Sequence, residues 1–280
     1  MSPAPPVALT IAGSDCSAGA GLQADLKTFS CFGVHGLTAV TAVVAETANA
    51  VHGIYPVEPA ALQEQVQLLL AAYPVAAIKT GMLGSKRHVV AVAELLSRVD
   101  IPLVVDPVMV ASTGDPLVPD DAVEAYRDRL LPLARVMTPN LPEAEALLGS
   151  DRGDAESMAG ELAGRFGSAV FLTGGHADGA GEAIDFLAED GAVRRFAGPW
   201  IEVPGSHGSG CTISAAITAG LARGRDLAGA VAEAKKFIGR ALEDSYEWSA
   251  GERPAIHALN QLCRGDGREV AAKGCGRPNT

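Results

Sequence analysis

The chain has 280 residues, of which 48% are hydrophobic and 20% charged, and its formal net charge is −11. This length favours one large domain or two small ones with a substantial buried core. The acidic balance argues against binding the phosphate backbone of nucleic acids, since no basic excess could release counterions.

No apolar run is long enough to span a bilayer, because the longest, such as 66–75, are too short or interrupted. The first six residues, Met-Ser-Pro-Ala-Pro-Pro, lack the charged and apolar regions of a signal peptide. The five cysteines are an odd number without Cys-x-x-Cys spacing, so neither a disulfide framework nor a zinc site is indicated. We therefore expect a cytoplasmic protein.

The first predicted elements are strands interrupted by one helix. An apolar run at 7–12 predicts a buried strand, a loop of small residues follows at 13–21, and helical spacing predicts a helix over 22–32. Two further apolar runs, at 34–45 and 51–57, predict strands.

From residue 60 onward, strands and helices alternate. Helices are predicted at 60–72, 86–99, 120–131, 142–148, 155–166, 210–222 and 227–242, and strands at 75–79, 102–105, 135–137 and 169–172. A hairpin is predicted over 181–196, with Glu189-Asp190-Gly191 as its turn. Such alternation predicts an α/β domain with a parallel sheet covered on both faces. We expect a single domain over 1–263, followed by a loose polar tail at 264–280.

Polar and glycine residues gather after the predicted strands, where ligands bind in such sheets. These positions are 13–21, Glu46, 79–83, 106–109, 138–143, 173–176 and 208–211. Their repeated placement at one edge of the sheet favours a functional interpretation of each.

The stretch from Pro204 to Thr212 has three glycines within six residues and precedes an apolar helix. Such a helix start presents unpaired N–H groups and a positive dipole end, which suit a phosphate. Cys211 would lie at its mouth, where the same field would lower the thiol pKa and favour a thiolate. The alternative is a Gly-rich turn before a packing helix, with an inert, buried cysteine.

Three further strand ends carry oxygen ligands or a charge. Asn140 and Glu143 flank a strand-to-helix turn, where they could hold Mg²⁺ against phosphates or only cap the helix. Asp106 ends an apolar strand and needs a partner, either a metal–phosphate network or a loop contact. Lys79 also ends a strand, and either a structural ion pair or ligand binding would explain it.

Together these stretches resemble the hydroxymethylpyrimidine and phosphomethylpyrimidine kinases of thiamine biosynthesis, within the ribokinase-like superfamily. The matching segments are Ala8-Leu-Thr-Ile-Ala-Gly-Ser-Asp15, Gly19-Ala-Gly-Leu-Gln-Ala-Asp-Leu-Lys-Thr-Phe29, Lys79-Thr-Gly-Met-Leu83, Asp106-Pro-Val-Met109, Thr138-Pro-Asn-Leu-Pro-Glu-Ala144, Gly174-Gly-His176 and His207-Gly-Ser-Gly-Cys-Thr212. The resemblance implies a three-layer α/β/α sandwich with a mainly parallel sheet. It also implies a homodimeric enzyme that uses ATP and Mg²⁺ to phosphorylate the hydroxymethyl group of a pyrimidine.

The resemblance also implies roles for individual residues. Cys211 would be the catalytic base, beside an anion hole formed by Gly208, Ser209 and Gly210. The substrate-binding residues would be Gly13, Asp15, Ala20, Asp25, Val44, Glu46, Met82 and Val108. The nucleotide would be bound by Lys79, Thr138, Asn140, Thr173, Gly175 and Lys235, and the metal by Asp106, Asn140 and Glu143.

Three departures from the family pattern bear on the substrate. Glu46 stands where the family typically has Gln, whose amide matches the amine and ring nitrogen of an aminopyrimidine. The loop at 111–114 lacks a common Lys, and Thr173 replaces another. The Thr variant also occurs in related pyridoxal kinases, so pyridoxal phosphorylation is the alternative function. A non-catalytic sensor that binds a pyrimidine or a vitamer is a weaker alternative.

Overall fold

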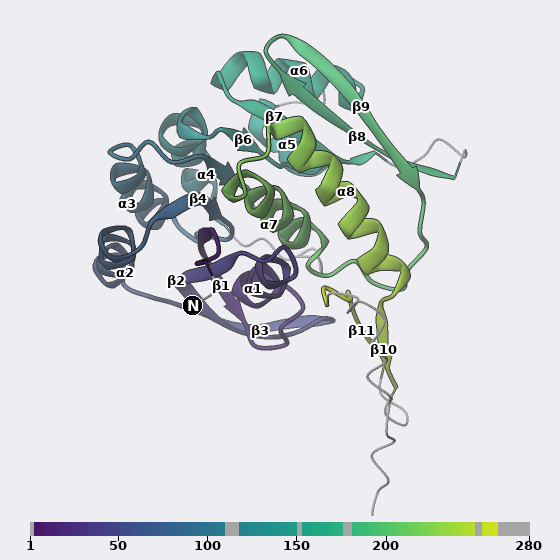
Figure 1. Cartoon of the computed structure of the whole chain (residues 1–280), viewed down its shortest axis with the longest axis horizontal. Helices are drawn as coiled ribbons and strands as arrows, with labels where there is room; N and C mark the ends of the chain where they lie inside the picture. The colour runs from purple at the N-terminus through teal and green to yellow at the C-terminus, as the bar shows by residue number, and fades with distance from the viewer. Residues whose placement is uncertain (1–2, 110–117, 150–152, 176–180, 250–253, 263–280) are drawn as a thin grey trace, which may run out of the picture.

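A nine-stranded sheet runs through the molecule in the order β3-β2-β1-β4-β5-β6-β7-β8-β9 (Figure 1). The computed structural model describes residues 3–109, 118–149, 153–175, 181–249 and 254–262. The parallel strands are β1 (Val7–Asp15), β2 (His35–Thr47), β4 (Val75–Thr80), β5 (Leu103–Val105), β6 (Val136–Met137) and β7 (Ala169–Gly175). The antiparallel strands are β3 (Ala50–Pro56), β8 (Glu182–Glu189) and β9 (Ala192–Pro199).

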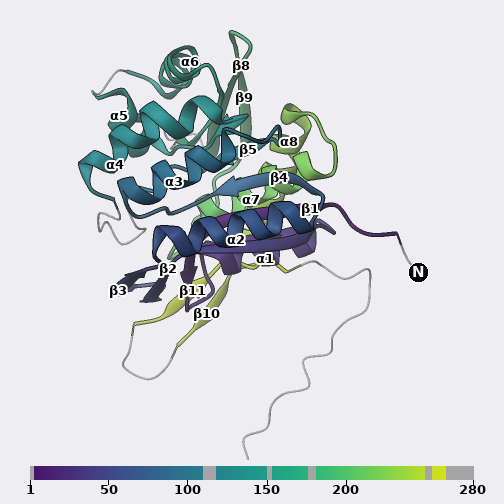
Figure 2. The same cartoon turned by 90° about the vertical axis from the view of Figure 1, so that its left-hand side faces the viewer.

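Helices cover both faces of this sheet (Figure 2). One layer contains α1 (Gly21–Cys31), α7 (Ser209–Ala222) and α8 (Leu227–Glu243). The other contains α2 (Pro59–Ala72), α3 (Lys86–Leu96), α4 (Asp120–Ala125), α5 (Leu141–Leu148) and α6 (Ala155–Phe166). The predicted three-layer α/β/α sandwich is thereby confirmed.

The hydrophobic core is divided between the two faces of the sheet by the alternation of side chains along each strand. In β5, Val105 packs into the core under α2–α6, whereas its neighbour Val104 packs into the core under α7 and α8. Met137 and Val136 in β6 divide in the same way. Because both faces are buried, these strands are continuous apolar runs in the sequence.

Most predicted elements agree with the structure to within a few residues. The predicted helix over 120–131 is distorted: α4 passes into a π-helical turn (Tyr126–Leu130) and then a 3₁₀ turn (Leu131–Leu133). Strand β3 is antiparallel because only two residues separate it from β2, and a connection that short permits only a hairpin. A small sheet of β10 (Tyr246–Trp248) and β11 (Ile256–Ala258) was not predicted.

Two further sequence-based expectations concern the ends of the chain and membranes. The single domain over 1–263 stays a prediction, and the predicted tail at 264–280 lies outside the described residues. Within the described ranges, no helix combines the length and apolarity needed to cross a membrane.

Candidate active site

A cavity of about 370 Å³ lies at the carboxyl ends of the parallel strands. Its lining includes Gly13, Asp15, Ala20, Val44, Glu46, Met82, Asp106, Val108, Thr138, Asn140, Glu143, Thr173, Ser206, His207, Gly208, Ser209, Gly210 and Cys211. An adjoining cavity of about 820 Å³ shares Asn140, Thr173, Ser209 and Gly210 with it and extends to Lys235. The two cavities therefore meet at the start of α7.

The start of α7, Gly208–Cys211, is the candidate anion-binding turn and borders the first cavity. Its N-cap, Gly208, has a φ of 82° and no side chain to cap the helix. A Cβ at Gly208 would overlap the Gly19 carbonyl, so only glycine fits this close contact between the two loops. The N–H of Ser209 donates to the Ser206 carbonyl (3.0 Å), whereas the N–H groups of Gly210 and Cys211 have no acceptor within the helix and provide hydrogen-bond donors at the cavity.

The thiol of Cys211 differs from the sequence-based expectation. Burial raises its pKa to about 12, and the positive charge of Lys79 offsets only part of this effect. The expected lowering of the pKa and the expected thiolate are therefore wrong, because desolvation, together with the negative charges of Asp106 and Asp25, outweighs the charge of Lys79. Cys211 still lines the cavity directly beside the anion-binding turn.

Asn140 and Glu143 form a complete capping box at the start of α5. Asn140 Oδ1 accepts from Glu143 N (2.9 Å), and Glu143 Oε2 accepts from Asn140 N (3.0 Å). Glu143 Oε1 also accepts from the N–H of Met109 (3.2 Å). The capping interpretation is thereby confirmed, and both oxygens of the Glu143 carboxyl group accept backbone hydrogen bonds.

Asp106 and Glu143 form a buried acidic pair on the cavity wall. Their exposed fractions are 4% and 5%. Burial, followed by the charge of Asp106, raises the pKa of Glu143 to about 8, and burial also raises the pKa of Asp106. The Ser214 hydroxyl on α7 hydrogen-bonds to Asp106 Oδ2 at 2.9 Å. Two desolvated carboxyl groups with raised pKa values form a site that a cation would stabilise.

Lys79 and Asp25 form a fully buried ion pair and line neither cavity. Lys79 Nζ lies 2.8 Å from Asp25 Oδ1 and 4.0 Å from Asp106 Oδ2, and Thr10 donates a further hydrogen bond to Asp25. Although burial opposes it, the charge of Asp25 holds the pKa of Lys79 above its usual range. The predicted roles of Asp25 in substrate binding and of Lys79 in nucleotide binding are therefore corrected: these side chains bind each other.

The part of the first cavity around Val44 and Met82 has apolar walls and one polar group. Val44, Met82 and Val108 line it, and a Cβ at Gly13 would lie 2.7 Å from the Met82 methyl group. Glu46, at the end of β2, provides the polar group. Burial, with the negative charge of Asp15, raises the pKa of Glu46 to about 7, while His207 opposes the shift.

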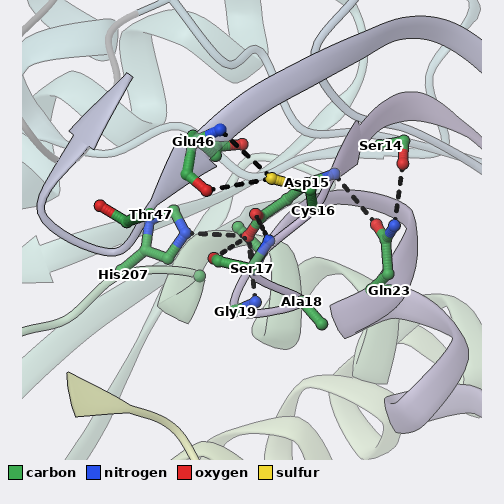
Figure 3. A network of polar contacts seen from close by, with 12 residues as sticks. Ser14, Asp15, Cys16, Ser17, Ala18, Gly19, Gln23, Glu46, Thr47 and His207 are labelled. Atoms are coloured by element: carbon green, nitrogen blue, oxygen red, sulfur yellow. Dashed lines mark hydrogen bonds and ion pairs between the residues drawn. The ribbon is translucent and has the colours of Figure 1, made fainter. Parts of the chain in front are cut away.

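Asp15 is the centre of a network that joins this part of the cavity to the start of α7 (Figure 3). Its Oδ2 accepts from His207 Nε2 (3.0 Å), Gly19 N (3.0 Å) and Ala20 N (2.7 Å). Burial would raise the pKa of Asp15, but the hydrogen bonds from His207, Ser17 and Ala20 lower it to about 2. Asp15 is therefore a charged anchor for the loop around it. Although it borders the cavity as predicted, its carboxylate is used to hold this loop.

Lys235, a predicted nucleotide-binding residue, lines the second cavity. Lys235 Nζ contacts Asp185 Oδ2 (2.5 Å), and Asp185 Oδ1 accepts from the Gly174 N–H (3.2 Å). Thr173 and Gly174 line this cavity, and the role of Gly175, the last residue of β7, stays a prediction. The loop at 111–114 and His176 lie outside the described residues.

Among the residues without a role assigned from the sequence, His207 lines the cavity, and Ser214 and Gln261 contact residues that border it. His207 is part of the matching segment at 207–212, so this motif could have indicated it as a site residue. Ser214 and Gln261 carry no such signal, because their contacts join segments more than 40 residues apart in the chain.

Comparison with known proteins identifies relatives along nearly the whole chain. The family model "Phosphomethylpyrimidine kinase" matches residues 15–255. The hydroxymethylpyrimidine/phosphomethylpyrimidine kinase of Rhizobium meliloti is 42% identical, over 90% of this chain and 96% of its own length. The thiamine biosynthesis bifunctional protein ThiED of Geobacter sulfurreducens is also 42% identical over 90% of this chain, which spans only 52% of that longer protein.

Among solved structures, the Staphylococcus aureus pyridoxal kinase in complex with AMP-PCP and pyridoxal is similar to the chain, with a TM-score of 0.80 and 32% identity. The similarity covers 92% of this chain and 94% of the pyridoxal kinase.

Proposed function

We infer the reaction of this protein from its membership of a family, since the chain belongs to the phosphomethylpyrimidine kinases and is an ATP-binding kinase. It phosphorylates the hydroxymethyl group of 4-amino-5-hydroxymethyl-2-methylpyrimidine in thiamine biosynthesis. We propose that it also phosphorylates the resulting monophosphate. In the first transfer, the substrate hydroxyl oxygen loses its proton to a base and bonds to the γ-phosphorus of ATP, the bond to the β,γ-bridging oxygen breaks, and ADP leaves. In the second, an oxygen of the monophosphate's phosphoryl group is the attacking atom.

One observation carries the proposal: a buried acidic pair and an uncapped helix start lie at one end of an apolar pocket that ends in a polar group. Asp106 and Glu143 form the acidic pair, Gly208–Gly210 form the helix start, and Glu46 is the polar group. Phosphoryl transfer needs a cation and backbone donors around the transferred group, together with an oriented acceptor. A sensor would need only the pocket, so the acidic pair favours the enzyme.

The residues around Asp106 fit a magnesium ion. Asp106 and Glu143 offer carboxylate oxygens, which Mg²⁺ prefers, and burial raises the pKa of both groups. Thr138 Oγ1 is buried beside them on the cavity wall and has no hydrogen-bond partner within the described residues. Asp106 and Glu143, with the Asn140 amide nearby, would hold the ion. A bound ion would neutralise charge on the phosphates.

The proposed base is Cys211. Because its pKa is raised, the thiol form predominates at neutral pH, and Cys211 must lose its proton before it can accept one from the substrate hydroxyl. The amides of Gly208 and Gly210 would stabilise negative charge on the transferred phosphoryl group, and that of Ser209 could join them only by leaving the Ser206 carbonyl.

Nucleotide and acceptor would occupy different parts of the two joined cavities. The cavity that contains Thr173 and Lys235 is continuous with the anion-binding turn and suits the nucleoside part of ATP. The apolar walls of the first cavity suit a flat ring whose polar edge contacts Glu46.

Pyridoxal phosphorylation remains the second candidate. Glu46 and Thr173 both depart from the pyrimidine kinase pattern, and the solved pyridoxal kinase is similar in fold. We therefore place the distinction between the two acceptors at Glu46.

The test is steady-state turnover with hydroxymethylpyrimidine, its monophosphate and pyridoxal side by side, for wild type and for Glu46→Gln. We expect hydroxymethylpyrimidine to have the highest kcat/KM with wild type. A higher kcat/KM for pyridoxal would contradict the proposal, and absence of turnover with all three would favour the sensor. The cytoplasmic location and the homodimer stay predictions, and a mass measurement in solution tests the latter.

A further inference from the structure

The segment after β11 contacts the active site although it follows every segment assigned a role from the sequence. Leu259 and Gln261 are 2% and 1% exposed, respectively. Leu259 packs into the core under α7 and α8, and the N–H of Asn260 donates to the Ala241 carbonyl at 3.0 Å. Gln261 is thereby held at a fixed position relative to the end of α8.

The side-chain amide of Gln261 joins the two loops of the active site. Its Nε2 donates to the Gly19 carbonyl (3.3 Å) and to Thr212 Oγ1 (3.1 Å). The Thr212 hydroxyl in turn donates to the Gly208 carbonyl at 2.7 Å. An amide nitrogen has two N–H groups, and each has an acceptor here: one on the loop at 13–21 and one on α7.

Gly19 lies at the centre of these contacts between the loop at 13–21 and α7. Its N–H donates to Asp15, its carbonyl accepts from Gln261, and the same carbonyl packs against the Cα of Gly208. His207, next to Gly208, makes the second connection through its bond to Asp15. The loop at 13–21, which borders the acceptor pocket, is thus joined to the anion-binding turn through both Asp15 and the Gly19 carbonyl.

We propose that Gln261 is a positioning residue for phosphoryl transfer. By fastening the loop at 13–21 to the start of α7, it sets the distance between the acceptor hydroxyl and the phosphoryl group held there. Displacing reacting groups by about 1 Å can cost on the order of 100-fold in rate. The inference rests on the proposed function, and Gln261 lies beyond residues 15–255, which the family model matches.

The test compares Gln261→Met with Gln65→Met. Methionine has a similar length and shape but no donor. Gln65 is a matched control, because its side chain bonds only to backbone groups of Val40 and Ala61, remote from the cavity. For Gln261→Met we expect kcat to fall by about 10- to 100-fold, with the KM for ATP unchanged within about twofold. For Gln65→Met we expect lower thermal stability with an unchanged kcat.

A second readout needs no substrate. In Gln261→Met, amide hydrogen exchange should accelerate together in peptides that cover 13–21 and 204–212, whereas in Gln65→Met neither peptide should change. This arm separates the inference from the proposed function: failure of the wild type to phosphorylate hydroxymethylpyrimidine would contradict only the latter.

If Gln261→Met does not fold, Thr212 provides the same test from the other side of the junction. Thr212→Ser keeps the hydroxyl group and should retain kcat, while Thr212→Val lacks the hydroxyl group and should lose it. A kcat within about twofold of wild type for Gln261→Met or Thr212→Val would overturn the proposal, since an unfastened loop should lower the rate. Unchanged exchange in both loops would also overturn it.

Discussion

Glu46 is the residue whose protonation state should decide how the acceptor binds. A neutral carboxyl group can donate to a ring nitrogen and accept from an adjacent amine, as an amide does, whereas a carboxylate can only accept. Burial and Asp15 raise its pKa to about 7, with His207 opposing. Below that pH the neutral form predominates, and above it the donor is lost.

We therefore predict that the wild-type kcat/KM for hydroxymethylpyrimidine falls relative to that of Glu46→Gln as the pH rises through about 7. The limiting slope is tenfold per pH unit, because one proton is lost. The ratio of the two kcat/KM values between about pH 6 and pH 9 measures the effect, and ionisations common to both enzymes cancel in it. A constant ratio would show that Glu46 does not contact the ring through a titrating proton.

Ionisation of the Cys211 thiol should raise kcat as the pH rises, which is opposite to the effect of Glu46 on kcat/KM. Since its pKa is raised to about 12, the thiolate fraction grows with pH throughout the neutral range. We predict that kcat at saturating substrate rises with pH in wild type, and that Cys211→Ala lowers kcat by ~10²–10⁴ and abolishes this rise. Circular dichroism controls for folding. Full kcat in Cys211→Ala would remove this residue from the mechanism.

At the scale of elements, the ion pair of Lys79 in β4 with Asp25 in α1 holds strand and helix together beneath the cavity. Removing one partner leaves an uncompensated buried charge, which costs ~3–5 kcal/mol, while replacing both by apolar residues is often neutral. We predict that Lys79→Met lowers the free energy of unfolding by this amount, and that adding Asp25→Leu restores much of it. Urea titration measures both changes.

The same variants test the corrected role of Lys79. Because its side chain is fully buried and paired, we expect the folded double variant to keep the KM for ATP within about twofold of wild type. A large rise in that KM, with stability restored, would return Lys79 to the nucleotide site.

The elements were predictable from the sequence because their signals are local. Apolar runs at 7–12 and 75–79, and the glycines before α7, describe strands and a helix start regardless of the remaining fold. The small sheet of β10 and β11 was missed because each strand has only three residues. The distortion after α4 was missed because the helical spacing continues through it.

Only those site residues that lie at strand ends were predictable from the sequence. Glu46, Asp106 and Asn140 follow strands, so the parallel sheet brings them to one edge. The interactions among them were not predictable, because they depend on burial. Desolvation reversed the expected pKa shift of Cys211, and it made Lys79 and Asp25 partners although they are 54 residues apart.

At the scale of the whole molecule, the two cavities draw on segments from β1 to β11, so ligand binding should stabilise the entire domain. We predict one cooperative thermal transition for the full chain, coincident in far-ultraviolet circular dichroism and tryptophan fluorescence. A non-hydrolysable ATP analogue with Mg²⁺ at about 100 times its Kd should add ~2.7 kcal/mol, a rise in Tm of roughly 5 °C. Glu143→Gln is the matched control, because Gln can keep the capping box of α5 while removing the charge beside Asp106. It should reduce the shift caused by nucleotide and Mg²⁺ but not the shift caused by the acceptor. Two separate transitions would contradict a single domain, and equal nucleotide shifts in both proteins would remove Glu143 from the metal site.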